Sequence, residues 1–177
     1  LAGVITGTLT DSAGAALVGA KVTLGYAGIT VAALEPASAQ LYATNEHGQF
    51  AFDVGEEGDY TLTWMDVENN QGAMKRVTVN RDANGNLISG PITMQAAELG
   101  DVAGRIVGRG ADAWAFLLGT SFQAAANVDG TFIISSVPAG NYQLAPGLLG
   151  VRGNAVAVTV EPGALTTVDE PLEFGPI

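Results

Sequence analysis

The sequence predicts an all-β protein made of two tandem seven-stranded Greek-key β-sandwiches. Three observations support this prediction. Similar stretches recur once along the 177 residues, apolar side chains alternate with polar ones in many short runs, and glycine-containing turns separate these runs at roughly ten-residue intervals. Alternation with a period of two gives a strand one buried face and one wet face. The chain is long enough for two units of roughly 80–100 residues, each with its own core.

The repeat consists of matching landmarks in the same order. The aligned pairs are Gly3–Gly7 with Gly100–Gly104, Asn45–Phe52 with Asn127–Ile134, Gly58–Leu62 with Gly140–Leu144, and Val77–Val79 with Val158–Val160. Because chance is a poor account of such an ordered series, we expect one unit at 1–97 and a second, shorter unit at 98–177. The connection between them is short and not rich in Gly or Ser, which disfavours freely swinging units.

Strands are expected wherever the alternation is regular. The chain opens with a strand-like run at 3–10, and the alternating apolar sets are Phe50, Phe52 and Val54; Tyr60, Leu62 and Trp64; Trp114, Phe116 and Leu118; and Val156, Val158 and Val160. We expect both tryptophans, Trp64 and Trp114, to pack in the core. The turns are predicted at Asp11–Gly14, His47–Gly48, Asn84–Asn86 and Asp129–Gly130, where glycine tolerates a positive φ.

These landmarks resemble the carboxypeptidase regulatory-like domain, a prealbumin (transthyretin-like), Ig-like β-sandwich. The family pattern contains Asp-x-x-Gly, Gly-Ala-x-Val-x-Leu, Thr-Asp-x-x-Gly-x-Phe-x-Phe and Pro-x-Gly-x-Tyr-x-Leu. The first unit supplies Asp11, Gly14, Gly19–Leu24, Thr44–Phe52 and Gly58–Leu62, and the second supplies Gly104, Asp129–Phe132 and Val137–Leu144. The opening of the second unit, at 108–113, is shorter than the pattern. The resemblance implies an accessory scaffold or adhesive module.

The residues of the pattern have structural roles. We expect Phe50 and Phe132 to anchor the two cores from the strand after a tight turn. The Gly-x-Tyr units at Tyr60 and Tyr142 are expected to lead into the next strand, with the ring packed inward and the hydroxyl at the rim.

Composition excludes several classes of function. There are 18 Asp+Glu against 7 Lys+Arg, for a formal net charge of -11, which argues against binding nucleic acid or docking on an anionic membrane. The chain has no cysteine, so disulfides and thiolate nucleophiles are excluded. The longest apolar stretch, at 113–122, is too short to be inserted across a bilayer.

Catalytic residues are scarce. His47 is the only histidine, and beside a turn glycine it is most simply a solvent-exposed turn residue. Histidine-based hydrolysis and zinc-peptidase chemistry both need further ligands or partners. No Gly-x-Ser-x-Gly elbow occurs. We therefore expect the protein not to be an enzyme.

Two candidate sites remain. The carboxylates of Asp53, Glu56, Glu57 and Asp59 cluster between two expected strands and are a candidate weak Ca²⁺ site, the alternative being a solvated acidic turn. No other cofactor is expected.

The second candidate site is an interaction surface formed by Tyr26, Leu34, Glu35 and Tyr42, in and beside a segment that only the first unit contains. The alternative is an insertion tolerated in a surface loop.

The sequence thus predicts a non-catalytic, extracellular structural or interaction module of the cell surface or of a secreted assembly. Its partners would be other proteins or further copies of the chain, paired through edge strands into a fibre, with the strand at 3–10 as the natural donor. The alternative is a carbohydrate-binding accessory module of a larger secreted enzyme, which would bind glycans through exposed aromatic side chains.

Overall fold

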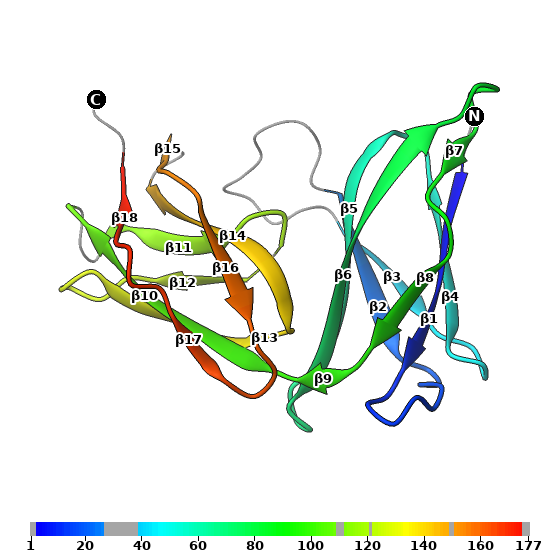
Figure 1. Cartoon of the computed structure of the whole chain (residues 1–177), viewed down its shortest axis with the longest axis horizontal. Coiled ribbons are helices and arrows are strands. Elements are labelled where there is room, and N and C mark those ends of the chain that lie inside the picture. The colour runs from blue at the N-terminus through cyan, green and yellow to red at the C-terminus, as the bar shows by residue number, and fades with distance from the viewer. Residues whose placement is uncertain (1–2, 27–38, 109–111, 121, 149–150, 175–177) are drawn as a thin grey trace.

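The computed structural model describes residues 3–26, 39–108, 112–120, 122–148 and 151–174. These residues form strands, turns and irregular segments and contain no α-helix, which confirms the all-β prediction (Figure 1). Within the same residues there is accordingly no helix able to span a bilayer.

Eighteen strands follow one another in the described parts of the chain. In the first half they are β1 (Gly3–Thr10), β2 (Lys21–Tyr26), β3 (Ala39–Ala43), β4 (Gln49–Val54), β5 (Gly58–Asp66), β6 (Gln71–Arg81), β7 (Leu87–Ile88), β8 (Ile92–Gln95) and β9 (Ala97–Glu98). In the second half they are β10 (Gly100–Val107), β11 (Trp114–Leu117), β12 (Gln123–Ala125), β13 (Thr131–Val137), β14 (Gly140–Leu148), β15 (Val151–Arg152), β16 (Val156–Val160), β17 (Leu165–Thr167) and β18 (Leu172–Glu173).

Each half of the chain builds two sheets. In the first half the orders are β4-β1-β8 and β3-β2-β5-β6, with β7 and β9 both paired to β6. In the second half they are β13-β10-β17 and β12-β11-β14, with β18 paired to β10 and with β15 and β16 both paired to β14. The pairs β1–β8, β10–β17 and β10–β18 are parallel, and the other strand pairs are antiparallel.

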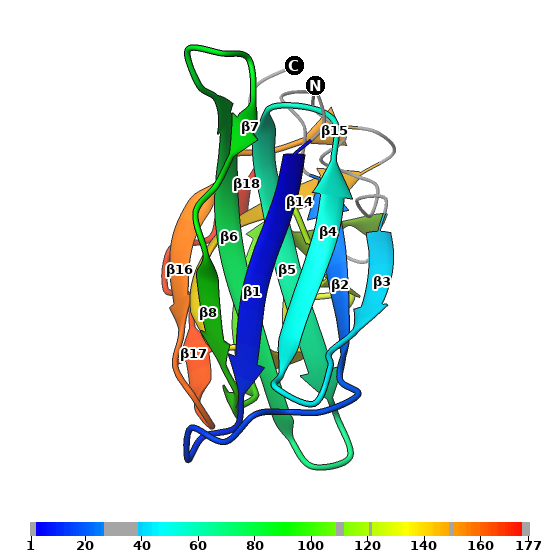
Figure 2. The same ribbon diagram turned by 90° about the vertical axis from the view of Figure 1, so that its right-hand side faces the viewer.

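The first strand does not lie at an edge. β1 pairs with β4 on one side and with β8 on the other, as Figure 2 shows. The strand at 3–10 lies inside its own sheet, where β4 pairs with residues 3–8 and β8 pairs with residues 7–10, and this arrangement counts against its predicted role as a donor strand.

Each pair of sheets encloses one hydrophobic core, and the core residues come from both sheets. Phe50 and Phe132 are 3% and 1% exposed, as the motifs predicted. The rings of Tyr60 and Tyr142 are also buried, and their hydroxyls donate to the carbonyls of Glu56 (2.8 Å) and Pro138 (2.6 Å). These hydrogen bonds satisfy hydroxyls that would otherwise be costly to bury.

Strand β11 faces the opposite way from the prediction. Trp64 is buried as expected, but Trp114 is 43% exposed, whereas Ala115 and Leu117 are completely buried. Because successive side chains of a strand point to opposite faces, Trp114 and Phe116 lie on the outer face of the sheet and the smaller residues face the core.

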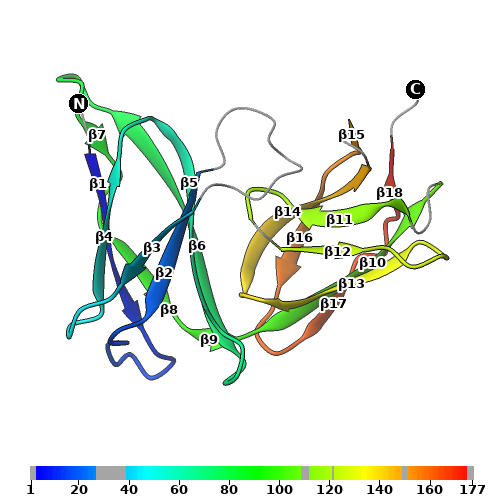
Figure 3. The same cartoon turned by 180° about the vertical axis from the view of Figure 1, so that it is seen from behind.

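The connection between the two halves is hydrogen-bonded along its length. β9 pairs with β6, and the N–H of Leu99 donates to the carbonyl of Asn70 at 3.1 Å. The N–H of Asp101 then donates to the carbonyl of Ala164 at 3.0 Å. Figure 3 shows β9 between β6 and β10, where the two halves meet. The connection is thus a structured strand and not a loose linker.

Candidate functional site

The predicted interaction surface is only partly within the described residues. Tyr26 ends β2 and Tyr42 lies in the adjacent strand β3, whose backbone pairs Val22 with Tyr42. Leu34 and Glu35 lie outside the described residues, as do the side chains of the two tyrosines. This surface therefore stays a prediction.

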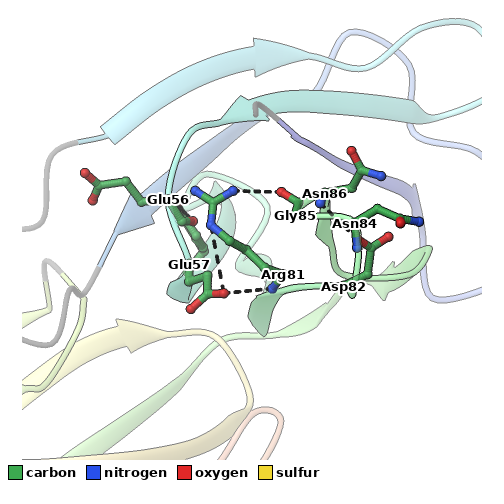
Figure 4. A network of polar contacts seen from close by, with 8 residues as sticks. Glu56, Glu57, Arg81, Asp82, Asn84, Gly85 and Asn86 are labelled. Atoms are coloured by element: carbon green, nitrogen blue, oxygen red, sulfur yellow. Dashed lines mark hydrogen bonds and ion pairs between the residues drawn. The ribbon is translucent and has the colours of Figure 1, made fainter.

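The acidic cluster does not converge on one point. Asp53 and Glu56 are exposed, and Figure 4 shows Glu56 pointing away from Glu57. The carboxylate of Glu57 accepts the backbone N–H of Arg81 at 2.9 Å and lies 4.0 Å from the Nε of the same residue. The carboxylate of Asp59 accepts a hydrogen bond from the Thr78 hydroxyl at 2.8 Å.

No three His, Cys, Asp or Glu side chains gather as a metal site would require, within the part of the chain that the structure describes. The cluster is instead divided between β4, the β4–β5 turn and β5, with one carboxylate bound to Arg81 and another to Thr78. Calcium binding stays a prediction.

The hairpin after Arg81 completes this polar network (Figure 4). The Nη1 of Arg81 donates to the carbonyl of Gly85 at 2.9 Å. The carboxylate of Asp82 accepts the backbone N–H groups of Asn84 and Asn86, each at 2.9 Å. These hydrogen bonds, that of Asn86 first, hold the pKa of Asp82 below its ordinary value. The segment is a hairpin turn, as the sequence predicted.

His47 lies exposed in the β3–β4 turn, where its Nε2 is 3.5 Å from a carboxylate oxygen of Glu46. It is a solvent-exposed turn residue, as the sequence predicted.

A cleft lies where the two halves of the chain meet. Met74, Lys75 and Arg76 of β6, with Gly140 and Asn141 of β14, line a cavity of about 320 Å³. The guanidinium carbon of Arg76 is 5.6 Å from the centre of the Tyr142 ring, within the range of a cation–π interaction.

Burial raises the pKa of the Tyr142 hydroxyl, and the nearby charge of Arg76 acts weakly in the opposite direction. The hydroxyl is also committed to the carbonyl of Pro138. The halves are thus joined beside this cleft by packing and a cation–π contact. Among the described residues, the lining consists of two cations, one amide, one thioether and one glycine.

The outward-facing aromatic residues of β11, exposed Trp114 and half-buried Phe116, form a second surface feature. Trp114 stands opposite Ala125 of β12 and Gly147 of β14, and Phe116 stands opposite Gln123 of β12 and Ala145 of β14. Sequence reasoning missed this feature because it placed the largest side chains of β11 in the core. The available signal was that Ala113, Ala115 and Leu117 form an equally regular apolar row on the other face.

No family model and no curated protein matches the chain. Several solved structures are similar at low levels. A streptococcal ancillary pilin is 14% identical with a TM-score of 0.38, over 99% of this chain and 63% of that one. The minor pilin of Streptococcus agalactiae is 12% identical with a TM-score of 0.37, over 98% and 97% of the two chains. The shaft pilin of Lactobacillus rhamnosus GG is 8% identical with a TM-score of 0.41, over the whole of both chains.

These TM-scores are too low to establish a common fold. This chain also spans less than two thirds of the length of the streptococcal ancillary pilin.

Proposed function

We propose that the chain is a non-catalytic structural module of a cell-surface or secreted assembly, made of two tandem copies of one transthyretin-like β-sandwich unit. The proposed units are residues 1–97 and 98–177. One observation carries the proposal: the strand order of the first half recurs in the second. β4-β1-β8 corresponds to β13-β10-β17, and β3-β2-β5-β6 corresponds to β12-β11-β14-β16.

Local contacts recur with the strand order. The N–H of Leu9 donates to the carbonyl of Gly48, and the N–H of Ile106 donates to the carbonyl of Gly130, both at 2.8 Å. The two buried tyrosines likewise each donate to a carbonyl four residues earlier. Such repeated detail supports the tandem copies and the resemblance to the carboxypeptidase regulatory-like family.

The junction supports a role as a spacer. The halves are connected through β9 without a flexible linker, and Met74 and Arg76 of the first half pack on the second. Two small sandwiches held in a fixed relation transmit force and orientation better than two that swing freely.

One edge strand is suited to pairing with another copy of the chain. β13 stands at the end of its sheet, and its seven residues include no charged side chain. Its Ile133 is 57% exposed, and Ala103 pairs with it on β10. Proteins usually protect an exposed edge with charges, prolines or bulges. β13 contains no charge and no proline, and its bulge lies between Ile134 and Val137, so the proposed pairing uses the regular stretch from Thr131 to Ile134.

Self-association is tested by sedimentation velocity and negative-stain microscopy of the purified chain at increasing concentration. We expect concentration-dependent oligomers, which Ile133→Lys should abolish by placing a charge on the pairing edge. The matched control is Val4→Lys, which puts the same charge on an exposed valine of the central strand β1. A chain that stays monomeric at every concentration would overturn the proposed assembly.

A further inference from the structure

We propose that β6 is a docking edge for an extended acidic peptide of a partner protein. The peptide adds to the sheet as a further strand and places two consecutive carboxylates beside Lys75 and Arg76. We call residues 73–79 of β6 the β6 gap. The inference goes beyond the structural role proposed above and does not depend on self-association, because the β13 edge belongs to the other half of the chain.

The β6 gap is an interruption in the pairing of one sheet edge. Along its first edge, β6 pairs with β5 over all the residues from 71 to 79. Along its second edge, β9 pairs with residues 71 and 72, and β7 pairs with residues 80 and 81. Between these two pairings the chain crosses to the other sheet as β8, which pairs with β1 (Figure 1). Among the described residues, no strand pairs with β6 inside the gap.

The backbone groups that the gap presents follow from the pairing at its ends. Successive residues of a strand direct their N–H and C=O groups to opposite edges. The carbonyl of Asn70 accepts a hydrogen bond from the residue after β9, and the N–H of Asp82 donates to the residue before β7. Even-numbered residues therefore face this edge, so Met74, Arg76 and Thr78 direct their backbone groups into the gap. An added strand would pair with these groups.

The charges of β6 determine which kind of strand can be added. β6 carries three of the seven Lys and Arg residues of the chain and no Asp or Glu. Arg81 forms an ion pair with the β4–β5 turn, whereas Lys75 and Arg76 form no ion pair with any described residue. The acidic residues of β5 and β9 pair with residues 71 and 78 of β6, not with the two cations. The middle of the gap is thus a cationic stretch in an acidic chain.

The two adjacent cations specify two adjacent carboxylates on the partner. Because successive side chains of a strand point to opposite faces, Lys75 and Arg76 lie on opposite faces of the sheet. Directly opposite residues of paired strands have Cβ atoms about 4.5–5.5 Å apart, so consecutive acidic residues would each face one cation. An uncharged strand such as β13 would leave both cations without a partner and is disfavoured.

The cleft between the two halves provides space and further donors beside the gap. Lys75, Arg76 and Asn141 are among the residues that line its volume of about 320 Å³. Arg76 lies over the Tyr142 ring, and this contact leaves the N–H groups at the edge of the guanidinium available. The side-chain oxygen of Asn141 accepts the Thr159 hydroxyl at 2.7 Å, so its amide group faces a ligand as a donor. Carboxylates are acceptors and match such a lining.

The test is an NMR titration of the full chain, labelled with ¹⁵N, with two synthetic peptides. One is Thr-Val-Thr-Glu-Glu-Thr-Val-Thr with blocked ends, and the matched peptide has Gln-Gln in place of Glu-Glu. Salt at about 0.15 M screens the other charges of the chain beyond about 8 Å. We expect the acidic peptide to shift the amide signals of Met74, Arg76 and Thr78 and to slow their hydrogen exchange. The Gln-Gln peptide should bind at least about threefold more weakly.

Two variants separate the contribution of charge from that of the backbone. Lys75→Ala should weaken binding of the acidic peptide on the order of two- to fivefold, the range of an exposed ion pair, and leave the Gln-Gln peptide unaffected. Thr78→Pro removes an N–H that faces the gap and should weaken binding of both peptides. The matched control is Thr78→Val, which also loses the hydroxyl bond to Asp59 but keeps the N–H. If Thr78→Pro folds poorly, hydrogen exchange of the unmodified protein still reports pairing at the edge.

Four results would overturn the proposal. The first two are unchanged amide signals of Met74, Arg76 and Thr78, and equal binding of the two peptides. The third is binding of polygalacturonate without binding of either peptide, which would assign the cations to an acidic polysaccharide. The fourth is loss of self-association in Lys75→Ala without peptide binding, which would assign the gap to contact between copies. Ile133→Lys should leave peptide binding unchanged, so the failure of one proposal is distinguishable from the failure of the other.

Discussion

In each half of the molecule a phenylalanine ring occupies the space above a glycine of the neighbouring strand. Gly7 pairs with Phe50 and Gly104 with Phe132, and a Cβ added to Gly104 would lie 2.7 Å from the Phe132 ring. That distance is far below van der Waals contact, so any larger residue at Gly104 displaces the ring. The motifs predicted the phenylalanines as core residues, but the contact with glycine depends on strand pairing and is not visible in the sequence.

We therefore predict that Gly104→Ala lowers the free energy of unfolding by about 1–3 kcal/mol, the usual cost of overpacking a core. The matched control is Gly55→Ala, where an added Cβ meets open space, and its effect should be within about 1 kcal/mol of zero. Urea unfolding followed by tyrosine fluorescence and circular dichroism measures both. Equal stability of the two variants would show that the Phe132 ring moves aside without cost.

At the scale of strands, the sequence predicts burial well where polar and apolar residues alternate. In β4 and β5 the residues between the buried aromatics are mostly small or polar, so only one face can be the inner one. The sequence of β11 is Trp-Ala-Phe-Leu, which is apolar on both faces of the strand. The prediction therefore relied on side-chain size and placed the two aromatic residues in the core, whereas Ala115 and Leu117 lie there. The large rings of this core, Phe132 and Tyr142, come from β13 and β14, and β11 contributes small residues facing them.

The position of β1 was unpredictable for a different reason. Its composition is that of a strand, which the sequence shows, but its partners β4 and β8 are distant in the chain. Local patterns contain no information on which strands pair across such separations. The contacts of the acidic cluster were unpredictable for the same reason. Arg81 and Thr78 of β6 donate hydrogen bonds to Glu57 and Asp59, and the local sequence does not show that β6 lies beside them.

The β6–β7 hairpin has a pH dependence that follows from its geometry. The carboxylate of Asp82 accepts the N–H groups of Asn84 and Asn86, which lowers its pKa below the ordinary 3.8. A group whose pKa is lower in the folded state stabilises that state above its unfolded pKa, and the contribution is lost as the pH falls through the folded pKa. The hairpin should therefore loosen only at a pH below the ordinary pKa of 3.8.

We predict that NMR titration of Asp82 and of the two amide protons gives a shared midpoint below 3.8. In Asp82→Asn, which retains an acceptor oxygen but does not ionise, those amide signals should not titrate in this range. A midpoint at or above 3.8 in the unmodified protein would contradict the hydrogen-bonded turn.

At the scale of the whole molecule, the relation between the two halves depends on two kinds of contact. The backbone contributes the β9–β6 pairing and the hydrogen bond from Leu99 to Asn70. Side chains contribute Arg76 over the Tyr142 ring and Met74, which packs against the second core. The backbone contacts limit how far the halves can separate, whereas the side-chain contacts, farther from the connection, resist rotation about it.

We predict that the double variant Met74→Ala with Arg76→Ala leaves both cores folded but frees their relative orientation. Each core is enclosed by its own sheets, so the loss should be confined to the interface, with about 0.5–1 kcal/mol from the cation–π contact. Small-angle scattering should show a broader range of maximum dimensions, and residual dipolar couplings should give different alignment tensors for the two halves.

Lys75→Ala is the control, because Lys75 lies between the two substituted residues and its side chain is exposed. In Lys75→Ala, residual dipolar couplings should give one alignment tensor shared by the two halves. If the two halves of the double variant also share one alignment tensor, the β9 pairing alone fixes their relative orientation. The stiffness of such a spacer would then come from backbone hydrogen bonds and not from side-chain packing.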